Sequence, residues 1–198
     1  MPTTTKMGIV YPSSSDLVKD GATAMGTIST TVDNKTGLVL IKSATFSAVS
    51  SVSLDAGTFS SIYDYYSIYI SGVSSADVSL KLRLRTSGSD NSTSNYYWSG
   101  VFTNRGAGPS RTSGTAANYF EAGTTGDSGF ATQINVFYPN NTTYKTFLQT
   151  SAFADFGTDT DTRNSSGLFN VTTQFDSLSI LPDSGTFSGR YSVFGVNQ

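Results

Sequence analysis

The chain has 198 residues, 37% of them hydrophobic and 13% aromatic, which is enough to bury one sizeable core or two small ones. Charged residues make up only 13% of the chain, about half of the roughly 25% usual in soluble domains, and the formal net charge is -2, so we expect a largely uncharged surface and no nucleic-acid partner. Cysteine and histidine are absent, which excludes disulfides, thiolate chemistry and the usual metal ligand and general base, and we expect no cofactor.

The first expected element is a short helix from Asp16 to Asp33, within an N-terminal segment of residues 1–37. Side chains of the run Ser13–Asp16 can accept hydrogen bonds from first-turn amides. Hydrophobic residues at heptad spacing form a thin seam along this helix: Val18, Met25, Ile28 and Val32. An isolated helix this short is marginal in water, so it needs a partner. It can pack on its own domain, or dock on sister helices or a larger assembly; we expect the second, as a homotrimer.

Residues 38–198 are expected to form one mainly β domain, an antiparallel β-sandwich of jelly-roll-like type with about nine or ten strands. From Gly37 onward the hydrophobic period is two, and clusters of Gly, Ser, Asp and Asn interrupt it at short intervals. The clearest strand is Asp77–Arg85, in which every second residue is apolar: Val78, Leu80, Leu82 and Leu84. One face of this strand should therefore enter the core.

Other segments with strand character follow along the chain: Leu38–Lys42, Thr45–Ser53, the alternation Tyr66, Ile68 and Ile70, Asn95–Thr103, the alternation Ile134, Val136 and Tyr138, Tyr144–Phe153, Leu168–Leu181 and Thr186–Val196. Three stretches lack a strand period and are expected to be loops: Thr86–Ser94, Asn104–Thr115 and Ala154–Gly167. The turn Pro182–Gly185 combines proline with a glycine suited to positive φ. We therefore expect the last two strands to form a closing hairpin.

Two patterns of acidic residues bear on metal binding and catalysis. Asp155, Asp159 and Asp161 lie within seven residues and could supply oxygen ligands to Ca²⁺, but their spacing does not fit an EF-hand and Arg163 would compete as a counter-ion. We therefore favour a solvated loop and assign no metal. Glu121 is the only glutamate, so no pair of carboxylates is arranged for glycoside hydrolysis, and no serine has a histidine base. We expect no enzymatic activity.

Aromatic residues gather in two runs, Tyr63–Tyr66 and Asn95–Trp98, and the second holds the only tryptophan. Exposed rings stack on the faces of sugars, so Tyr96, Tyr97 and Trp98 are candidates for receptor or glycan contact. The alternative is that alternate rings face the core while the others pack between subunits, and this is the interpretation that we favour.

The two ends of the chain carry distinctive strings. Near the N-terminus lies Gly8–Ala22, whose specific part is Asp-Leu-Val-Lys-Asp-Gly at residues 16–21. Near the C-terminus, the run Phe175–Gly189 is followed by Tyr-Ser-Val-Phe-Gly at 191–195. Both ends resemble small fibre-like virion proteins of tailed bacteriophages, and the C-terminal run is similar to the closing hairpin of those proteins. The middle of the chain matches only in style, so the resemblance implies a role but no site residues.

In such proteins the N-terminal segment attaches the fibre to the particle and the sandwich points outward as a trimer. The resemblance therefore implies a virion structural protein, tail fibre-like, that mediates host adsorption after assembly in the host cytoplasm. Its partners would be other virion proteins, two further copies of itself and a host-surface glycan. The alternative is a capsid decoration or head-fibre protein that binds and stabilises the shell. No run approaches the roughly 20 apolar residues of a membrane span, so we expect no membrane insertion.

Overall fold

The computed structural model describes residues 21, 23, 25–28, 37–157 and 159–196. The chain divides into two units, Met1–Val39 with Asn197–Gln198, and Leu40–Val196. The described residues are mainly β, as expected, and they form thirteen strands in two antiparallel sheets. The mainly β class predicted from the period of two is thereby confirmed.

Most of the expected helix Asp16–Asp33 lies outside the described residues. The backbone is helical at residues 25–28, a stretch too short to establish the element, so the helix stays a prediction. Its proposed seam is only half described: Val18 and Val32 lie outside the described residues, Met25 is 70% exposed and Ile28 is half-buried. Within the part of the chain that can be described, no helix is long and apolar enough to cross a membrane.

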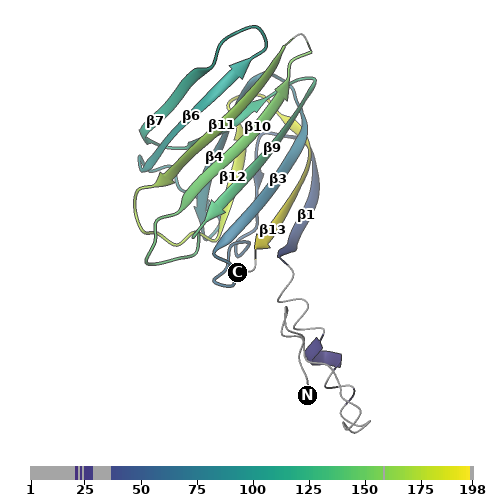
Figure 1. Cartoon of the computed structure of the whole chain (residues 1–198), viewed down its shortest axis with the longest axis vertical. Helices are drawn as coiled ribbons and strands as arrows, with labels where there is room; N and C mark the ends of the chain where they lie inside the picture. Colours follow the sequence, from purple (N-terminus) through teal and green to yellow (C-terminus); the bar gives the residue numbers. More distant parts are fainter. Residues whose placement is uncertain (1–20, 22, 24, 29–36, 158, 197–198) are drawn as a thin grey trace. The chain divides into compact units, whose positions relative to one another are not determined.

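Eight strands form the large sheet, which Figure 1 shows face-on, with β7 and β1 at its two edges. Neighbouring strands are antiparallel wherever the register is defined, from β13 across to β7. In sheet order the strands are β1 (Leu38–Val49), β13 (Phe187–Val196), β3 (Tyr65–Ser74), β9 (Gly129–Phe137), β10 (Phe147–Asp155), β11 (Thr160–Phe169), β6 (Tyr96–Asn104) and β7 (Ser110–Ala117).

The small sheet lies behind the large one in Figure 1 and contains five strands. They are β2 (Val52–Ser53), β12 (Ser177–Pro182), β4 (Val78–Thr86), β5 (Ser89–Asp90) and β8 (Phe120–Thr125), of which β8 pairs with β4. Strand β4 confirms the clearest sequence prediction, because Leu80, Leu82 and Leu84 are each at most 1% exposed. Its polar residues occupy the opposite face.

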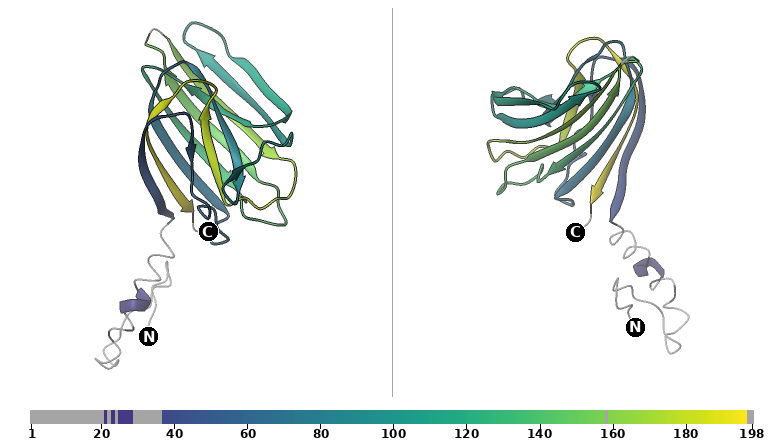
Figure 2. Two further views of the ribbon diagram at one scale, coloured as in Figure 1. Left: turned by 180° about the vertical axis from the view of Figure 1, so that it is seen from behind. Right: turned by 45° about the horizontal axis from the view of Figure 1, so that its top comes forward.

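The inward faces of both sheets contribute to one hydrophobic cluster. In a strand, alternate side chains point to opposite faces, so each sheet supplies every second residue. The large sheet contributes Tyr66, Ile68, Ile134 and Val136, and the small sheet contributes Leu82, Leu178 and Ile180, all at most 1% exposed. Each such aliphatic side chain contributes about 1.5–3 kcal/mol by burial. We call the side of each sheet that faces away from this cluster its outer face; Figure 2 shows the two sheets from further directions.

All three expected loops contain strand residues. The stretch Thr86–Ser94 includes the two-residue β5, Asn104–Thr115 includes the first residues of β7, and Ala154–Gly167 includes most of β11; strand β8 was not expected at all. The inward residues of β11 include Asp161, Arg163 and Ser165, and β7 has no large apolar residue, so neither strand carries the apolar alternation used for prediction. Backbone pairing with the neighbouring strands, rather than an apolar alternation, holds β11 and β7 in the sheet.

The prediction that the last two strands form a closing hairpin is also wrong. Strand β12 pairs with β2 and β4 in the small sheet, whereas β13 pairs with β3 in the large sheet, so the turn Pro182–Gly185 crosses between sheets. The expected positive φ is present, since Gly185 has φ +74°, and a Cβ there would collide with the Ser75 hydroxyl. The expected segment Leu168–Leu181 is divided accordingly: β11 ends at Phe169 and β12 begins at Ser177.

Candidate functional site

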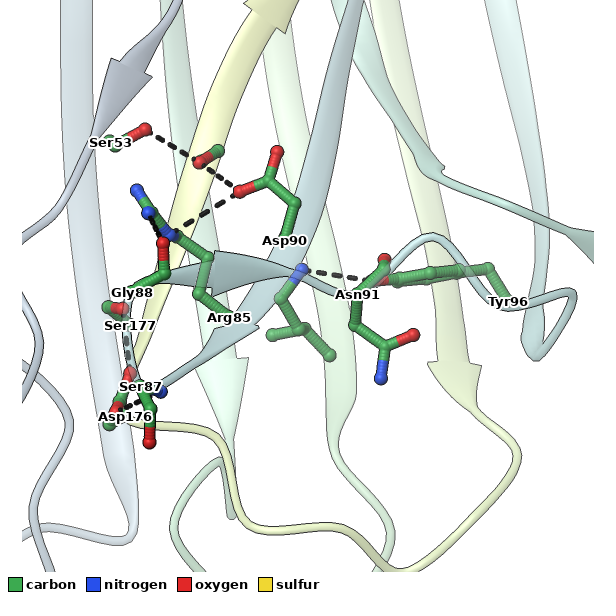
Figure 3. Close-up of polar contacts among 11 residues, drawn as sticks. Ser53, Arg85, Ser87, Gly88, Asp90, Asn91, Tyr96, Asp176 and Ser177 are labelled. Atoms are coloured by element: carbon green, nitrogen blue, oxygen red, sulfur yellow. Dashed lines mark hydrogen bonds and ion pairs between the residues drawn. The ribbon is translucent and has the colours of Figure 1, made fainter.

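The structure places two of the three aromatic candidates in the core. Tyr96 is fully buried and Trp98 is 7% exposed, so neither can contact a receptor or glycan; only Tyr97, between them, is half-exposed. The reason is the pleat of β6, which points alternate rings inward. The Tyr96 hydroxyl accepts a hydrogen bond from the Leu84 amide (2.9 Å) and donates one to the Asn91 carbonyl (2.9 Å; Figure 3), and burial raises its pKa.

Trp98 is enclosed by small and aromatic neighbours. Its ring centroid lies 6.4 Å from that of Phe120 on β8, and a Cβ at Gly114 on β7 would collide with the indole. The interpretation that alternate aromatic residues of Asn95–Trp98 face the core is therefore confirmed.

The loop that precedes β6 is tied to the small sheet by a polar network (Figure 3). Arg85 Nε lies 3.4 Å from Asp90 Oδ1, which also accepts a hydrogen bond from Ser179 (2.7 Å). Asp176 accepts two more, from the Ser87 amide and the Ser177 hydroxyl, each at 2.8 Å. The charges of this region are therefore engaged by protein partners.

The three aspartates considered for Ca²⁺ do not converge. Asp155 ends β10 and accepts a hydrogen bond from the Gly157 amide (2.9 Å), whereas Asp161 is buried on the inward side of β11. Among the residues that can be described, no three His, Cys, Asp or Glu side chains lie together as a metal site would require.

Asp161 belongs instead to a buried charged cluster with Glu121 and Arg163. Glu121 on β8 forms an ion pair with Arg163 on β11, which links the two sheets, and Arg163 Nη2 lies 3.5 Å from Asp161 Oδ2. Thr124 donates a hydrogen bond to the same Asp161 oxygen (2.8 Å). Burial raises the pKa of Asp161, with a smaller contribution from Asp159, and burial lowers the pKa of Arg163.

A pocket of about 700 Å³ lies on the outer face of the large sheet, a size suited to a small ligand. Strands β3, β9, β10 and β13 contribute its outward side chains, among them Tyr69, Gln133, Ser151, Arg190, Ser192 and Phe194. Tyr69 is 43% exposed and meets Phe194 edge to face, with the ring centroids 5.9 Å apart. An exposed ring is thus held in position among hydroxyl and amide groups.

Hydrogen bonds on the sheet orient the amide side chains beside this ring. Gln133 Nε2 donates to the Tyr69 hydroxyl (3.3 Å) and the Ser67 hydroxyl (3.4 Å). Asn135 Oδ1 accepts from the Tyr65 hydroxyl (2.8 Å) and from Ser67 (3.1 Å). The side-chain oxygen of Gln133, Oε1, accepts no hydrogen bond from any residue that the structure describes, so it is available to a ligand hydroxyl.

A second pocket, of about 610 Å³, adjoins the first across β10. Its lining includes Val101, Arg111, Ser113, Gln149, Asn164 and Ser166, again mostly hydroxyl and amide side chains. Among the described residues, neither pocket is lined by a carboxylate or a lysine, and each is lined by one arginine. The other polar side chains are uncharged. Such groups beside an aromatic ring suit a sugar, whose hydroxyls form hydrogen bonds and whose C–H face stacks on the ring.

No model of a protein family, no curated protein and no solved structure matches the chain. The site is therefore described from the geometry and chemistry of its own residues alone. Sequence reasoning missed it because Tyr69, Gln133 and Asn135 are the polar alternates of the strands recognised by their apolar residues. The signal that the sequence offered was the type of these residues. One aromatic and two amide side chains occupy outward strand positions at which a serine would suffice.

Proposed function

We propose that this protein is a carbohydrate-binding adsorption protein of a tailed-phage particle, without catalytic activity, and that its β domain is a jelly-roll sandwich. The observation that carries the binding function is the pocket beside Tyr69 on the outer face of the large sheet. The placement on a phage particle rests on the resemblance of residues 8–22 and 175–195 to small fibre-like virion proteins.

The strand order supports the jelly-roll assignment. Eight strands, β1, β2, β3, β4, β8, β9, β12 and β13, can be numbered one to eight along the chain. They then lie in the order 1-8-3-6 in the large sheet and 2-7-4-5 in the small sheet, which is the jelly-roll order. The antiparallel pairs β10–β11 and β6–β7 are additions that extend the large sheet beyond β9. The second pocket lies on these four added strands, and the first lies mainly on β3, β9 and β13.

The chemistry of the pocket favours a glycan over other ligand classes. Tyr69 offers an exposed ring, and Gln133, Ser151 and Ser192 offer hydrogen-bonding groups that carry no charge. Sugars need both kinds of contact, because their C–H faces pack on aromatic rings while their hydroxyls require partners. A single pocket open to water binds weakly. Three linked copies in a homotrimer, assembled through the N-terminal seam, would gain avidity on a surface that repeats the same glycan.

Binding to an array of bacterial cell-surface glycans tests the proposal. The intact chain should bind at least one glycan, and Tyr69→Ala should weaken that binding at least tenfold by removing the stacking ring. Tyr144→Ala is the matched control, because Tyr144 is 55% exposed but does not line the pocket. The proposal fails if no glycan binds, or if Tyr69→Ala binds as well as the control.

A cryo-EM map of the intact particle separates the adsorption role from the alternative. Density for this chain on the tail or baseplate is the expected result. Density on capsid vertices or capsomer centres would instead favour a decoration protein that binds the shell. Light scattering of the purified chain tests self-assembly, with the mass of a trimer as the expected result.

A further inference from the structure

The two pockets belong to one row of side chains that runs across seven strands of the large sheet. Starting at Arg111 on β7, the residues paired in register from strand to strand are Val101, Asn164, Ser151, Gln133, Tyr69 and Ser192. Every residue of this row lines one of the pockets. This row and the two adjoining pockets make up one surface that crosses the strands, which we call the groove.

An arginine lies at each end of this groove. Arg111 begins the row on β7, and Arg190 lies on β13, two residues from Ser192. Both arginines are exposed, and neither forms an ion pair or a side-chain hydrogen bond with a described residue. By contrast, Arg83, Arg85 and Arg163 all bond to acceptors within the protein.

The two arginines are the only charged residues among the described side chains that line the groove. None of these described side chains is acidic, so a ligand with negative groups meets no repulsion from them. Six steps between neighbouring strands separate β7 from β13, which at about 4.8 Å a step is about 29 Å. A ligand that reaches both arginines must be an extended chain of several sugar units.

We propose that the groove binds a linear acidic polysaccharide, with a carboxylate of the chain at Arg190 and another at Arg111. The inference rests on the proposed carbohydrate-binding function and names the class of glycan. A guanidinium group can bind a carboxylate through two parallel hydrogen bonds, which gives both strength and orientation. Tyr69 and the amide and hydroxyl groups between the two arginines contact the intervening sugars.

Calorimetric titration with matched polymers tests this inference. The probes are polygalacturonate, hyaluronate, alginate and polysialate, each in native form and after chemical reduction of its carboxyl groups. We expect at least one native polymer to bind at least tenfold more tightly than its reduced form, because charged hydrogen bonds are lost with the carboxylates. Binding of the native polymer should also weaken with salt, since the arginines are exposed.

The variants Arg190→Gln and Arg111→Gln should each weaken the native polymer's binding roughly tenfold and leave the reduced polymer's binding unchanged. Arg105→Gln is the matched control, because Arg105 is exposed but lies outside both pockets. Thermal melting of each variant verifies the fold. Fragments too short to span about 29 Å should respond to only one of the two arginine substitutions.

Each outcome decides between the two proposals. Equal binding of native and reduced polymers, or of neutral glycans alone, overturns the acidic-ligand inference and leaves carbohydrate binding in place. Equal loss in Arg105→Gln also overturns it, because a general charge effect would then explain the binding. Absence of binding to any native polymer, reduced polymer or arrayed glycan overturns the proposed function itself.

Discussion

The outer faces of the two sheets use charged residues differently. On the small sheet Lys81 is paired with Asp183 and lies 4.3 Å from the Tyr119 ring centroid, and Arg85 is paired with Asp90. On the large sheet Arg190 and Arg111 have no acidic partner among the residues that the structure describes. Arginine thus has an acidic partner within the protein on the small sheet and none among the described residues on the large sheet.

This difference separates groups that hold the structure from groups that are free to bind. A side chain with protein partners at every polar atom would have to lose them to bind a ligand, which costs free energy. An exposed arginine beside uncharged hydroxyl and amide groups has only water to displace. The large sheet is therefore the face on which binding would be expected to change with mutation, and the small sheet the face on which stability would change.

The largest effect on stability should come from the buried ion pair that joins the sheets. Arg163→Met leaves the Glu121 carboxylate buried without its cation, so we expect a loss of about 3–5 kcal/mol in the free energy of unfolding. Lys81→Met is the control, because its pair with the 54% exposed Asp183 side chain should be worth under about 1 kcal/mol. Urea denaturation measures both. Similar losses in the two variants would contradict the distinction between the sites.

A smaller effect should follow from removing one buried hydroxyl. Tyr96→Phe leaves the Leu84 amide and the Asn91 carbonyl without the partners they have in the native fold, and should cost about 1–3 kcal/mol. Tyr97→Phe, on the neighbouring half-exposed ring, should stay within about 0.5 kcal/mol of the native chain. Thermal unfolding of the two variants compares them directly, and equal melting temperatures would refute the structural role of the Tyr96 hydroxyl.

The pH dependence of stability tests the environment of Asp161. Its carboxyl has a pKa above the ordinary value of 3.8, because burial disfavours the charged form. The folded state therefore binds a proton that the unfolded state has released. This contribution to stability is present below about pH 3.8 and is lost as pH rises through the raised pKa.

The substitution Asp161→Asn removes the titration while keeping an oxygen that can accept the hydrogen bond from Thr124. We expect the difference in unfolding free energy between Asp161→Asn and the native chain to shift in favour of the variant as pH rises from 3 to 7. Urea denaturation at a series of pH values gives this difference. A constant difference over the range would mean that the Asp161 pKa is not raised.

The sequence predicts strands well where their inward residues are apolar, as in β4, where Leu80, Leu82 and Leu84 alternate with polar residues. It fails for β11, whose inward Asp161 and Arg163 are stabilised by partners on other strands. Local pattern cannot reveal such partners, because they are brought together only by the fold. The same limit explains the closing hairpin: the turn chemistry at Gly185 is correct, but the sheet that each strand joins is set by distant pairing.

The binding surface could be predicted only in part for the same reason. The sequence suggests glycan contact by the aromatic residues of β6 as a hypothesis, but consecutive aromatics on a strand give no sign of which face each ring takes. The row from Arg111 to Ser192 combines residues from seven strands whose order in the sheet differs from their order in the chain. Without that order, Tyr69 and Asn164 are separate polar residues on separate strands.

The smallest effect on stability, and a large effect on binding, should come from Gln133→Ala. Gln133 lies on the outer face, where its hydrogen bonds to Tyr69 and Ser67 are long, at 3.3 and 3.4 Å, so the free energy of unfolding should change by no more than about 0.5 kcal/mol. Glycan binding should weaken about tenfold, because the amide is at the centre of the groove and also orients the Tyr69 hydroxyl.

Measured together with Tyr96→Phe, this variant tests the comparison between the two faces. Gln133→Ala should lose binding and keep its melting temperature, and Tyr96→Phe should lose melting temperature and keep binding at a temperature where it is folded. A variant that lost both would show that the groove and the core of the domain are energetically coupled. The outer face of the large sheet would then have to be treated as part of the structural framework and not as a separate binding surface.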